Sequence, residues 1–199
     1  MIERAKRMAS DRQRCNDDLT AVVVMGVSGA GKSTVAQQLA RRLGWSFAEG
    51  DALHPVPNVA KMASGEPLTD ADRAPWLAAV AQVIGAWRSR GEHGVITCSA
   101  LKRAYRRQII GDHRDVRLLY LEGSRDLIAD RMAGRHGHFM PASLLDSQFA
   151  ALDSPAADEN PITVGVDRPV PEIVESILGF MCASARLPDS IPSNSGGMK

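Results

Sequence analysis

Short apolar runs alternate with longer segments of helical spacing along this chain. Five runs are rich in apolar or β-branched residues, namely Ala21–Met25, Trp45–Ala48, Val95–Cys98, Val116–Leu121 and Ile162–Val166. Runs of this length, bounded by turn residues, are typical of buried strands. Strands that alternate with helices predict a parallel sheet covered on both faces. We therefore expect an α/β domain with three layers and a central five-stranded parallel sheet.

The clearest helix is expected to begin after Thr69, whose side chain can cap it. Asp72 lies three residues further on, where a carboxylate favours a helix start. Apolar residues then recur with helical period, at Trp76, Leu77, Val80, Val83, Ile84 and Trp87. Such a stripe predicts core or interface packing rather than a cofactor site. Further helices are expected at Thr34–Leu43, from Ser124 to about Arg135, from Pro141 to about Leu152 and at Pro171–Ala185.

Composition and charge exclude several classes of protein. The net charge is +1, and 24% of residues are charged. This balance provides no general attraction for nucleic acid or for a membrane surface, and no apolar run approaches the length of a membrane span. Cys15, Cys98 and Cys182 are odd in number and lack the spacing of a zinc site. We interpret them as unpaired thiols of a reducing compartment and expect a cytoplasmic protein.

One folded domain is expected, at residues 19–185. Residues 1–18 are polar and slightly basic, and they lack the apolar core of a secretory signal. We interpret them as a flexible extension. Residues 186–199 are rich in Ser, Gly and Pro, a composition typical of a disordered tail.

The most informative motif follows the first predicted strand and opens a helix. It matches the phosphate-binding P-loop pattern and reads Gly26, Val27, Ser28, Gly29, Ala30, Gly31, Lys32, Ser33 and Thr34. Glycines let successive N–H groups point at one anion, and the helix adds its positive dipole end. Lys32 would reach the β- and γ-phosphates of a nucleotide, and the Ser33 hydroxyl would bind Mg²⁺. The alternative is a glycine turn that binds nothing.

Polar residues after the second and third predicted strands indicate what could accept the phosphate. Glu49, Gly50, Asp51 and His54 follow the second strand, and Ser99, Lys102 and Arg103 follow the third. Ligands of open α/β sheets bind beyond the carboxyl ends of the strands, so these groups predict a pocket for a polar acceptor beside the γ-phosphate. The guanine-reading N-K-x-D motif is absent, which argues against a regulatory GTPase. The glycine-rich, basic segment Gly134–Met140 has the composition of a lid over phosphates.

From about Val22 to Ile177 the chain resembles the gluconokinase family. The segments that carry the resemblance are G-V-S-G-A-G-K-S-T at Gly26–Thr34, L-G-W-S-F-A-E-G-D-A-L-H-P at Leu43–Pro55, N-V-A-K-M-A-S-G-E-P-L-T-D-A-D-R-A-P-W-L at Asn58–Leu77, C-S-A-L-K-R-A-Y-R at Cys98–Arg106, H-F-M-P at His138–Pro141 and S-Q-F at Ser147–Phe149. Many families share the P-loop, whereas the combination with E-G-D-x-L-H and C-S-A-L-K-R is far more specific. His136 departs from the family, which often has lysine there.

The resemblance implies a P-loop kinase fold of the shikimate-kinase type, with a short lid. It also implies that ATP with Mg²⁺ phosphorylates the terminal hydroxyl of D-gluconate, giving 6-phosphogluconate for the pentose phosphate pathway, and that the chain forms a homodimer. Two alternatives remain open. The protein could be another small-molecule P-loop kinase, of the shikimate or adenylylsulfate type, or a nucleotide-binding regulator without catalysis.

The position of Asp51 after the second strand makes it the candidate to orient or deprotonate the acceptor hydroxyl. On the residues alone, helix capping or a surface turn explains Asp51 equally well, and the resemblance favours the catalytic role. The matching segments also imply a set of substrate-binding residues, namely Asp51, His54, Lys61, Arg73, Ser99, Arg103, His138 and Gln148. No Asp follows the third strand as in a usual Walker B, so Ser99 is a candidate to help hold Mg²⁺ or its water.

Arg131 and Arg135 are four residues apart on one helix face that runs into the expected lid. We assign Arg131 to the nucleotide, stacked on adenine or in contact with phosphates, and Arg135 to catalysis on closure. The alternative is ion pairing with Asp126 or Asp130. The loop Asp167–Pro169, after the fifth strand, is expected to border the adenine.

Overall fold

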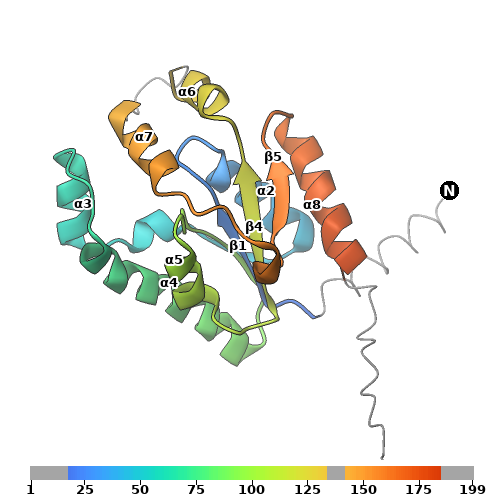
Figure 1. Ribbon diagram of the computed structural model, residues 1–199. Coiled ribbons are helices and arrows are strands. Elements are labelled where there is room, and N and C mark those ends of the chain that lie inside the picture. Colours follow the sequence, from blue (N-terminus) through green and yellow to red (C-terminus); the bar gives the residue numbers. More distant parts are fainter. Residues whose placement is uncertain (1–17, 134–141, 185–199) are drawn as a thin grey trace, which may run out of the picture.

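A single parallel sheet lies at the centre of the molecule (Figure 1). In the computed structural model, which describes residues 18–133 and 142–184, its strand order is β2-β3-β1-β4-β5. The strands are β1 (Ala21–Met25), β2 (Ser46–Ala48), β3 (Gly94–Thr97), β4 (Val116–Glu122) and β5 (Ile162–Gly165). All neighbouring pairs are parallel. The five expected strands are thus confirmed, with some ends displaced by a residue.

Helices cover both faces of the sheet, as expected. They are α2 (Lys32–Leu43), α3 (Val56–Ala63), α4 (Asp70–Arg90), α5 (Arg103–Ile110), α6 (Arg125–Ala133), α7 (Ala142–Ala150) and α8 (Val170–Ser184), with short 3₁₀ turns η1 (Gly50–Leu53) and η2 (Ala157–Glu159). Thr69 caps α4 as expected, because its hydroxyl accepts from the Asp72 N–H at 3.2 Å while the Asp72 carboxylate accepts from the Thr69 N–H at 2.7 Å. The sequence pattern does not single out α3 or α5.

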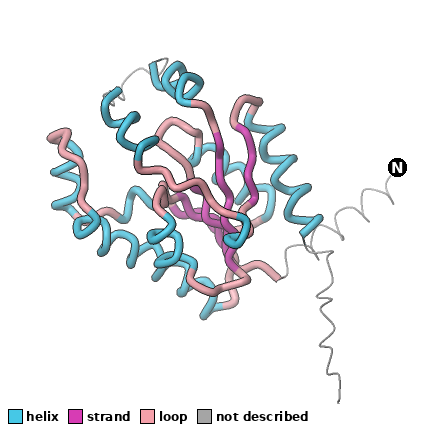
Figure 2. The backbone as a smooth tube through the Cα atoms, in the orientation of Figure 1, coloured by secondary structure: helices cyan, strands magenta, loops and turns pink. Residues whose placement is uncertain are grey.

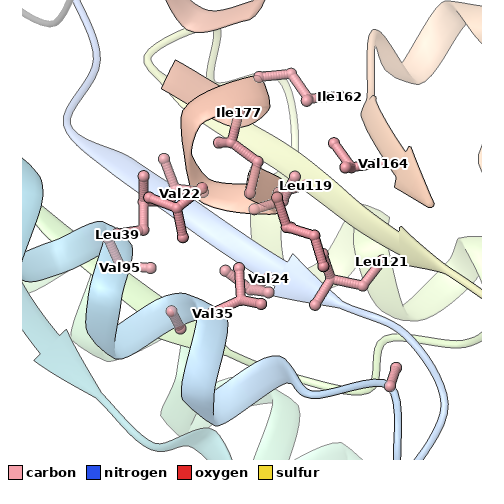
Figure 3. Packing of buried hydrophobic residues seen from close by; sticks show 14 of the residues in the cluster. Val22, Val24, Val35, Leu39, Val95, Leu119, Leu121, Ile162, Val164 and Ile177 are labelled. Carbon is pink, nitrogen blue, oxygen red and sulfur yellow. The ribbon is translucent and has the colours of Figure 1, made fainter. Parts of the chain in front are cut away.

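Alternate residues of the central strands face opposite layers of helices. Val22 and Val24 point to the face covered by α2 and α8, where Leu39 and Ile177 pack against them (Figure 3). Val23 lies in the other cluster, on the face covered by α4 and α5. The stripe expected to pack into the core does so, because Trp76, Leu77, Val80, Ile84 and Trp87 are buried and Val83 packs partly buried beside them. Full burial of β1 explains its continuous apolar run.

The carboxyl ends of the strands lead into the loops that carry the candidate site residues (Figure 2). β1 leads to the P-loop, β2 to η1, and β3 to the segment before α5. The expected extension (except Asp18), the tail 186–199 and the lid segment 134–140 lie outside the described residues. Among the helices that are described, none is long and apolar enough to cross a membrane.

Candidate active site

The P-loop adopts a conformation that only glycine permits at several points. Gly26 has φ 141°, and a Cβ there would lie 2.8 Å from the Leu121 carbonyl oxygen. Gly29 has φ 84°, and its Cβ would lie 2.8 Å from Cγ of Met132 on α6. Gly31, with φ 91°, is the N-cap of α2. The loop therefore follows closely on a strand, packs against α6 and opens a helix, which is the geometry of an anion cradle.

The P-loop has both buried apolar side chains and polar side chains. Val27 and Ala30 are buried. Lys32 is 9% exposed, and its ammonium donates to the Val27 carbonyl at 3.1 Å, so the loop itself holds this cation. Ser33 is half-buried and Thr34 exposed in the first turn of α2.

Gln148 of α7 contacts the same loop. The Ser28 N–H donates to Gln148 Oε1 at 2.7 Å, and Gln148 Nε2 donates to the Ser28 hydroxyl at 3.0 Å. The structure thus brings Gln148, a candidate for the acceptor substrate, to the phosphate loop and connects α7 to it.

The turn that carries Asp51 is fixed to β3 and α4. The Gly50 N–H donates to the Thr97 hydroxyl at 3.0 Å, and Trp76 Nε1 donates to the Gly50 carbonyl at 2.7 Å. The Thr97 hydroxyl in turn donates to the carboxylate of Glu49. A Cβ at Gly50 would lie 1.8 Å from the Thr97 carbonyl oxygen, so this close approach requires glycine. Asp51 follows directly, with its side chain exposed in η1.

His54 stacks on the indole of Trp76, with ring centroids 4.2 Å apart and an interplanar angle of 15°. Its pKa is lowered from 6.5, first by burial and also by the charge of Arg73, while the charge of Asp51 opposes the shift. His54 is therefore neutral near pH 7. Its Nδ1 is buried and has no hydrogen-bond partner within the described part of the chain.

Positive charge gathers around Tyr105 at the start of α4 and α5. The Arg73 guanidinium lies 5.9 Å from the centre of the Tyr105 ring, and the Lys102 ammonium lies 5.5 Å from it. Asp70 accepts from Lys102 at 2.8 Å and from the Tyr105 hydroxyl. The bond from Lys102 is the main reason why the pKa of Asp70 is lowered. Arg73 also donates to the Leu68 carbonyl.

Lys61 joins α3 to the start of α4. Its ammonium lies 2.8 Å from Asp72 Oδ2, and Asn58 Nδ2 donates to the Asp72 carbonyl at 2.7 Å. The bond from Lys61 is the largest of several that hold the pKa of Asp72 well below its usual range. This candidate for substrate binding is thus engaged in an ion pair.

The segment after β3 links the two halves of the site. The Gly26 N–H donates to the Ser99 carbonyl at 3.4 Å, so Ser99 lies directly beside the P-loop. The Arg103 N–H donates to Asp153 at 3.0 Å, and its guanidinium pairs with Asp158. Arg103 Nε is buried without a hydrogen-bond partner among the described residues.

A hollow of about 460 Å³ lies beyond β4 and β5. Its lining comprises Glu122, Gly123, Ser124, Leu127, Val166 and Asp167. Arg131 donates to the Val166 carbonyl in this region, rather than to the acidic neighbours Asp126 or Asp130. Arg135, His136 and His138 lie outside the described residues, so the structure does not place them.

Thr97 and Tyr105 are absent from the candidates that sequence reasoning identifies, although both organise the site. A weak signal exists for Thr97, which is the polar end of an otherwise apolar strand next to the Cys98–Arg106 segment. Tyr105 lies inside that segment, but its role depends on the approach of α4, which the sequence does not reveal.

Comparison with known proteins places this chain in a family. A family model described as an AAA domain matches residues 22–155. The gluconokinase of Gluconobacter oxydans (strain 621H) is 52% identical over 157 residues, which cover 79% of this chain and 88% of that protein. The chain belongs to the gluconokinase family. The expected resemblance is thereby confirmed.

Solved structures agree with membership of the gluconokinase family. A gluconokinase from Sinorhizobium meliloti 1021 matches with a TM-score of 0.77 and 43% identity, covering 83% of this chain and 93% of that one. The APS kinase of Mycobacterium tuberculosis, solved with AMPPNP and APS, matches with a TM-score of 0.59 and 21% identity, covering 82% and 97%. That second likeness concerns the fold alone, so the expected P-loop kinase fold is confirmed.

Proposed function

We propose that this protein phosphorylates D-gluconate at its terminal hydroxyl with ATP, giving 6-phosphogluconate. One observation supports the proposal most strongly. The Asp51 turn is fixed to Thr97 of β3, and two residues later Ser99 meets Gly26 of the P-loop. A candidate base and a phosphate cradle are thus attached to β3 and to the residues directly after it, in a chain whose relatives include gluconokinases.

The P-loop would hold the phosphates of ATP. The backbone from Gly26 to Thr34 would supply N–H groups, and Lys32 would offset charge on the transferring group. The glycines allow the loop to adopt this conformation, because Cβ atoms at Gly26 and Gly29 would clash with β4 and α6. The Ser33 hydroxyl would be a ligand of Mg²⁺, which neutralises charge on the β- and γ-phosphates when bound. Ser99 would assist as a second polar group nearby.

Asp51 would accept a hydrogen bond from the acceptor hydroxyl and orient it for in-line attack. Phosphoryl transfer depends on such positioning more than on covalent chemistry. The exposed side chain of Asp51 and the rigid backbone on its N-terminal side support this role. Arg135 would approach the transferring phosphoryl group from the segment that follows α6.

The sugar acid would bind between η1 and the starts of α4 and α5. Arg73 is the group we assign to the carboxylate, because its charge lies beside His54 and Tyr105. Neutral His54 would hydrogen-bond the polyol through its imidazole ring. Arg103 would contribute the guanidinium of its partly exposed side chain, and His138 would close the site. Lys61 and Gln148 would act at its edges, since both have partners in α4 or the P-loop.

The adenine would lie in the hollow beyond β4 and β5. Val166 and Asp167 line it, and Arg131 contacts Val166 from α6. Arg131 would stack on the base or reach the phosphates. This arrangement keeps the nucleotide and the sugar acid on opposite sides of the P-loop, as transfer between them requires.

The wider setting follows from the same proposal. We expect a cytoplasmic homodimer that supplies the pentose phosphate pathway and has neither nucleic acid nor membrane as partner. A kinase of another small acceptor is the second candidate, because an APS kinase shares the fold. The sequence identity to the gluconokinases is at least twice the identity to the APS kinase, which favours gluconate as the acceptor.

A coupled assay of ADP formation tests the function. Purified protein with ATP and Mg²⁺ is offered a panel of sugar acids, shikimate and adenylylsulfate, and gluconate should give the highest kcat/KM. Turnover of shikimate or adenylylsulfate without turnover of gluconate would overturn the proposal. No turnover of any acceptor, with ATP still bound, would favour a regulator.

The variant Asp51→Ala tests the proposed base separately. It should bind ATP nearly as the wild type does, because Asp51 lies outside the P-loop. Its turnover of gluconate should fall by about 10²- to 10⁴-fold, the range typical of general acid–base groups. Turnover close to that of the wild type would assign the base to another residue.

A further inference from the structure

Arg106 of α5 is a charged residue buried in the core. Its side chain is 2% exposed, and it forms a two-point ion pair with Glu159. Nε donates to Glu159 Oε2 at 2.6 Å, and Nη2 donates to Glu159 Oε1 at 2.9 Å. Hydrogen bonding from Arg106 is the main reason why the pKa of Glu159 is lowered. Burying a charged guanidinium costs free energy unless its N–H groups are all hydrogen-bonded. The partners of the remaining N–H groups therefore indicate which part of the chain Arg106 holds in place.

Those donors hold the backbone of the segment that follows β3. Nη1 lies 3.2 Å from the Ala100 carbonyl oxygen, 3.1 Å from that of Leu101 and 2.9 Å from that of Asp153. Ala100 has φ 44°, in the left-handed region that a residue with a Cβ seldom adopts. Such a conformation persists where its surroundings determine it, and the Arg106 guanidinium provides that restraint.

The restrained segment reaches both halves of the proposed site. At one end, the Ser99 carbonyl accepts from Gly26 of the P-loop. At the other end, Lys102 pairs with Asp70 at 2.8 Å, beside the Tyr105 ring. A shift of the backbone between these ends would change the distance from the phosphate loop to the acceptor groups. Such a shift would slow transfer.

We propose that Arg106, held by Glu159, is a positioning residue that fixes residues 99–103 and so sets the acceptor side of the site against the P-loop. This inference rests on the proposed function. The planar guanidinium is essential to it, because a lysine ammonium cannot bind the Glu159 carboxylate at two points and the backbone carbonyls at once.

Arg106→Lys and Glu159→Gln test this role, since both keep the approximate size of the side chain. Arg88→Lys is the matched control. Arg88 of α4 also pairs with a carboxylate, Asp115, at 2.7 Å, but it is 34% exposed. For each variant we would measure KM for gluconate, KM for ATP, kcat, the melting temperature and hydrogen exchange of the peptide that covers residues 98–106.

Both test variants should raise KM for gluconate or lower kcat by about tenfold, with KM for ATP within about twofold of wild type. Exchange at residues 98–106 should become faster while the core strands stay protected. Arg88→Lys should change none of these values. Unchanged kinetics and exchange in Arg106→Lys would overturn the proposal, and so would loss of the folded core in both variants, which would make the pair purely structural.

The outcome for the proposed function can be read separately. If the wild type does not turn over gluconate, the function is wrong, whereas the exchange measurement still tests the restraint of residues 98–106. If the wild type is active and the variants keep wild-type KM and kcat, only the positioning role is wrong.

Discussion

Replacement of Thr97 by valine tests whether the Asp51 turn is held by β3. Thr97 is 1% exposed, and its hydroxyl accepts from the Gly50 N–H at 3.0 Å and donates to Glu49. Valine keeps the shape of the side chain but removes both bonds. The buried Gly50 N–H then lacks its acceptor, which costs about 1–3 kcal/mol.

In a chain of 199 residues, this loss of stability should produce a measurable fall in the melting temperature. Each kcal/mol lowers the melting temperature by about 2–4 °C at this length, so the variant should melt roughly 2–12 °C lower. The turn also carries Asp51, and a displacement of about 1 Å can cost as much as a hundredfold in rate. We expect kcat/KM for gluconate to fall between about ten- and a hundredfold.

The assay combines calorimetry with steady-state kinetics. Thr163→Val is the matched control, because Thr163 lies on β5 of the same sheet but is exposed. It should stay within about 0.5 kcal/mol of the wild type, as is usual for surface substitutions. KM for ATP should remain within about twofold in both variants, since neither residue lies in the P-loop. A Thr97→Val variant with wild-type melting temperature and kcat/KM would refute the reasoning.

Further predictions concern the P-loop, helix α4, His54 and Cys98. Gly29→Ala should raise KM for ATP at least about tenfold, because its φ is 84° and a Cβ would meet Met132. Gly85→Ala in α4 has open space, so it should raise the free energy of unfolding by about 0.5–1 kcal/mol in a denaturant titration. Since burial lowers the pKa of His54 from 6.5, the unfolded chain takes up the proton first. Stability should therefore fall as the pH drops below about 6.5, and less so in His54→Asn; equal slopes in both proteins would contradict this. Burial raises the pKa of Cys98 to about 12, so iodoacetamide at neutral pH should leave it unmodified in the folded protein, and mass spectrometry showing rapid alkylation would contradict this.

The sequence predicts the layers of this fold well, because the central strands β1 and β3 are fully buried and therefore read as apolar runs. β1 and its P-loop follow directly from the pattern, and Thr69 forms the reciprocal cap with Asp72 that the spacing predicts. Helix α3 escapes prediction for a physical reason. Its apolar residues Val56 and Val59 are 82% and 50% exposed, so its pattern does not follow a core face.

The candidate site can be predicted where a motif fixes the local geometry. It is harder to predict where the contacting residues are distant in the sequence. The P-loop glycines adopt the positive φ angles that the motif requires. Gln148 shows the limit, because its contact with Ser28 spans 120 residues of sequence and depends on where α7 docks. Thr97 and Arg106 act through backbone groups of other segments, and the sequence alone does not reveal which segments those are.

Identification of the product tests the central claim most directly. The protein would be incubated with ATP, Mg²⁺ and D-gluconate, and the product analysed by phosphorus and proton NMR. The account predicts a phosphomonoester on the terminal carbon, which is 6-phosphogluconate, formed in step with ADP. Unchanged gluconate beside phosphorylated shikimate or adenylylsulfate in parallel reactions would contradict it.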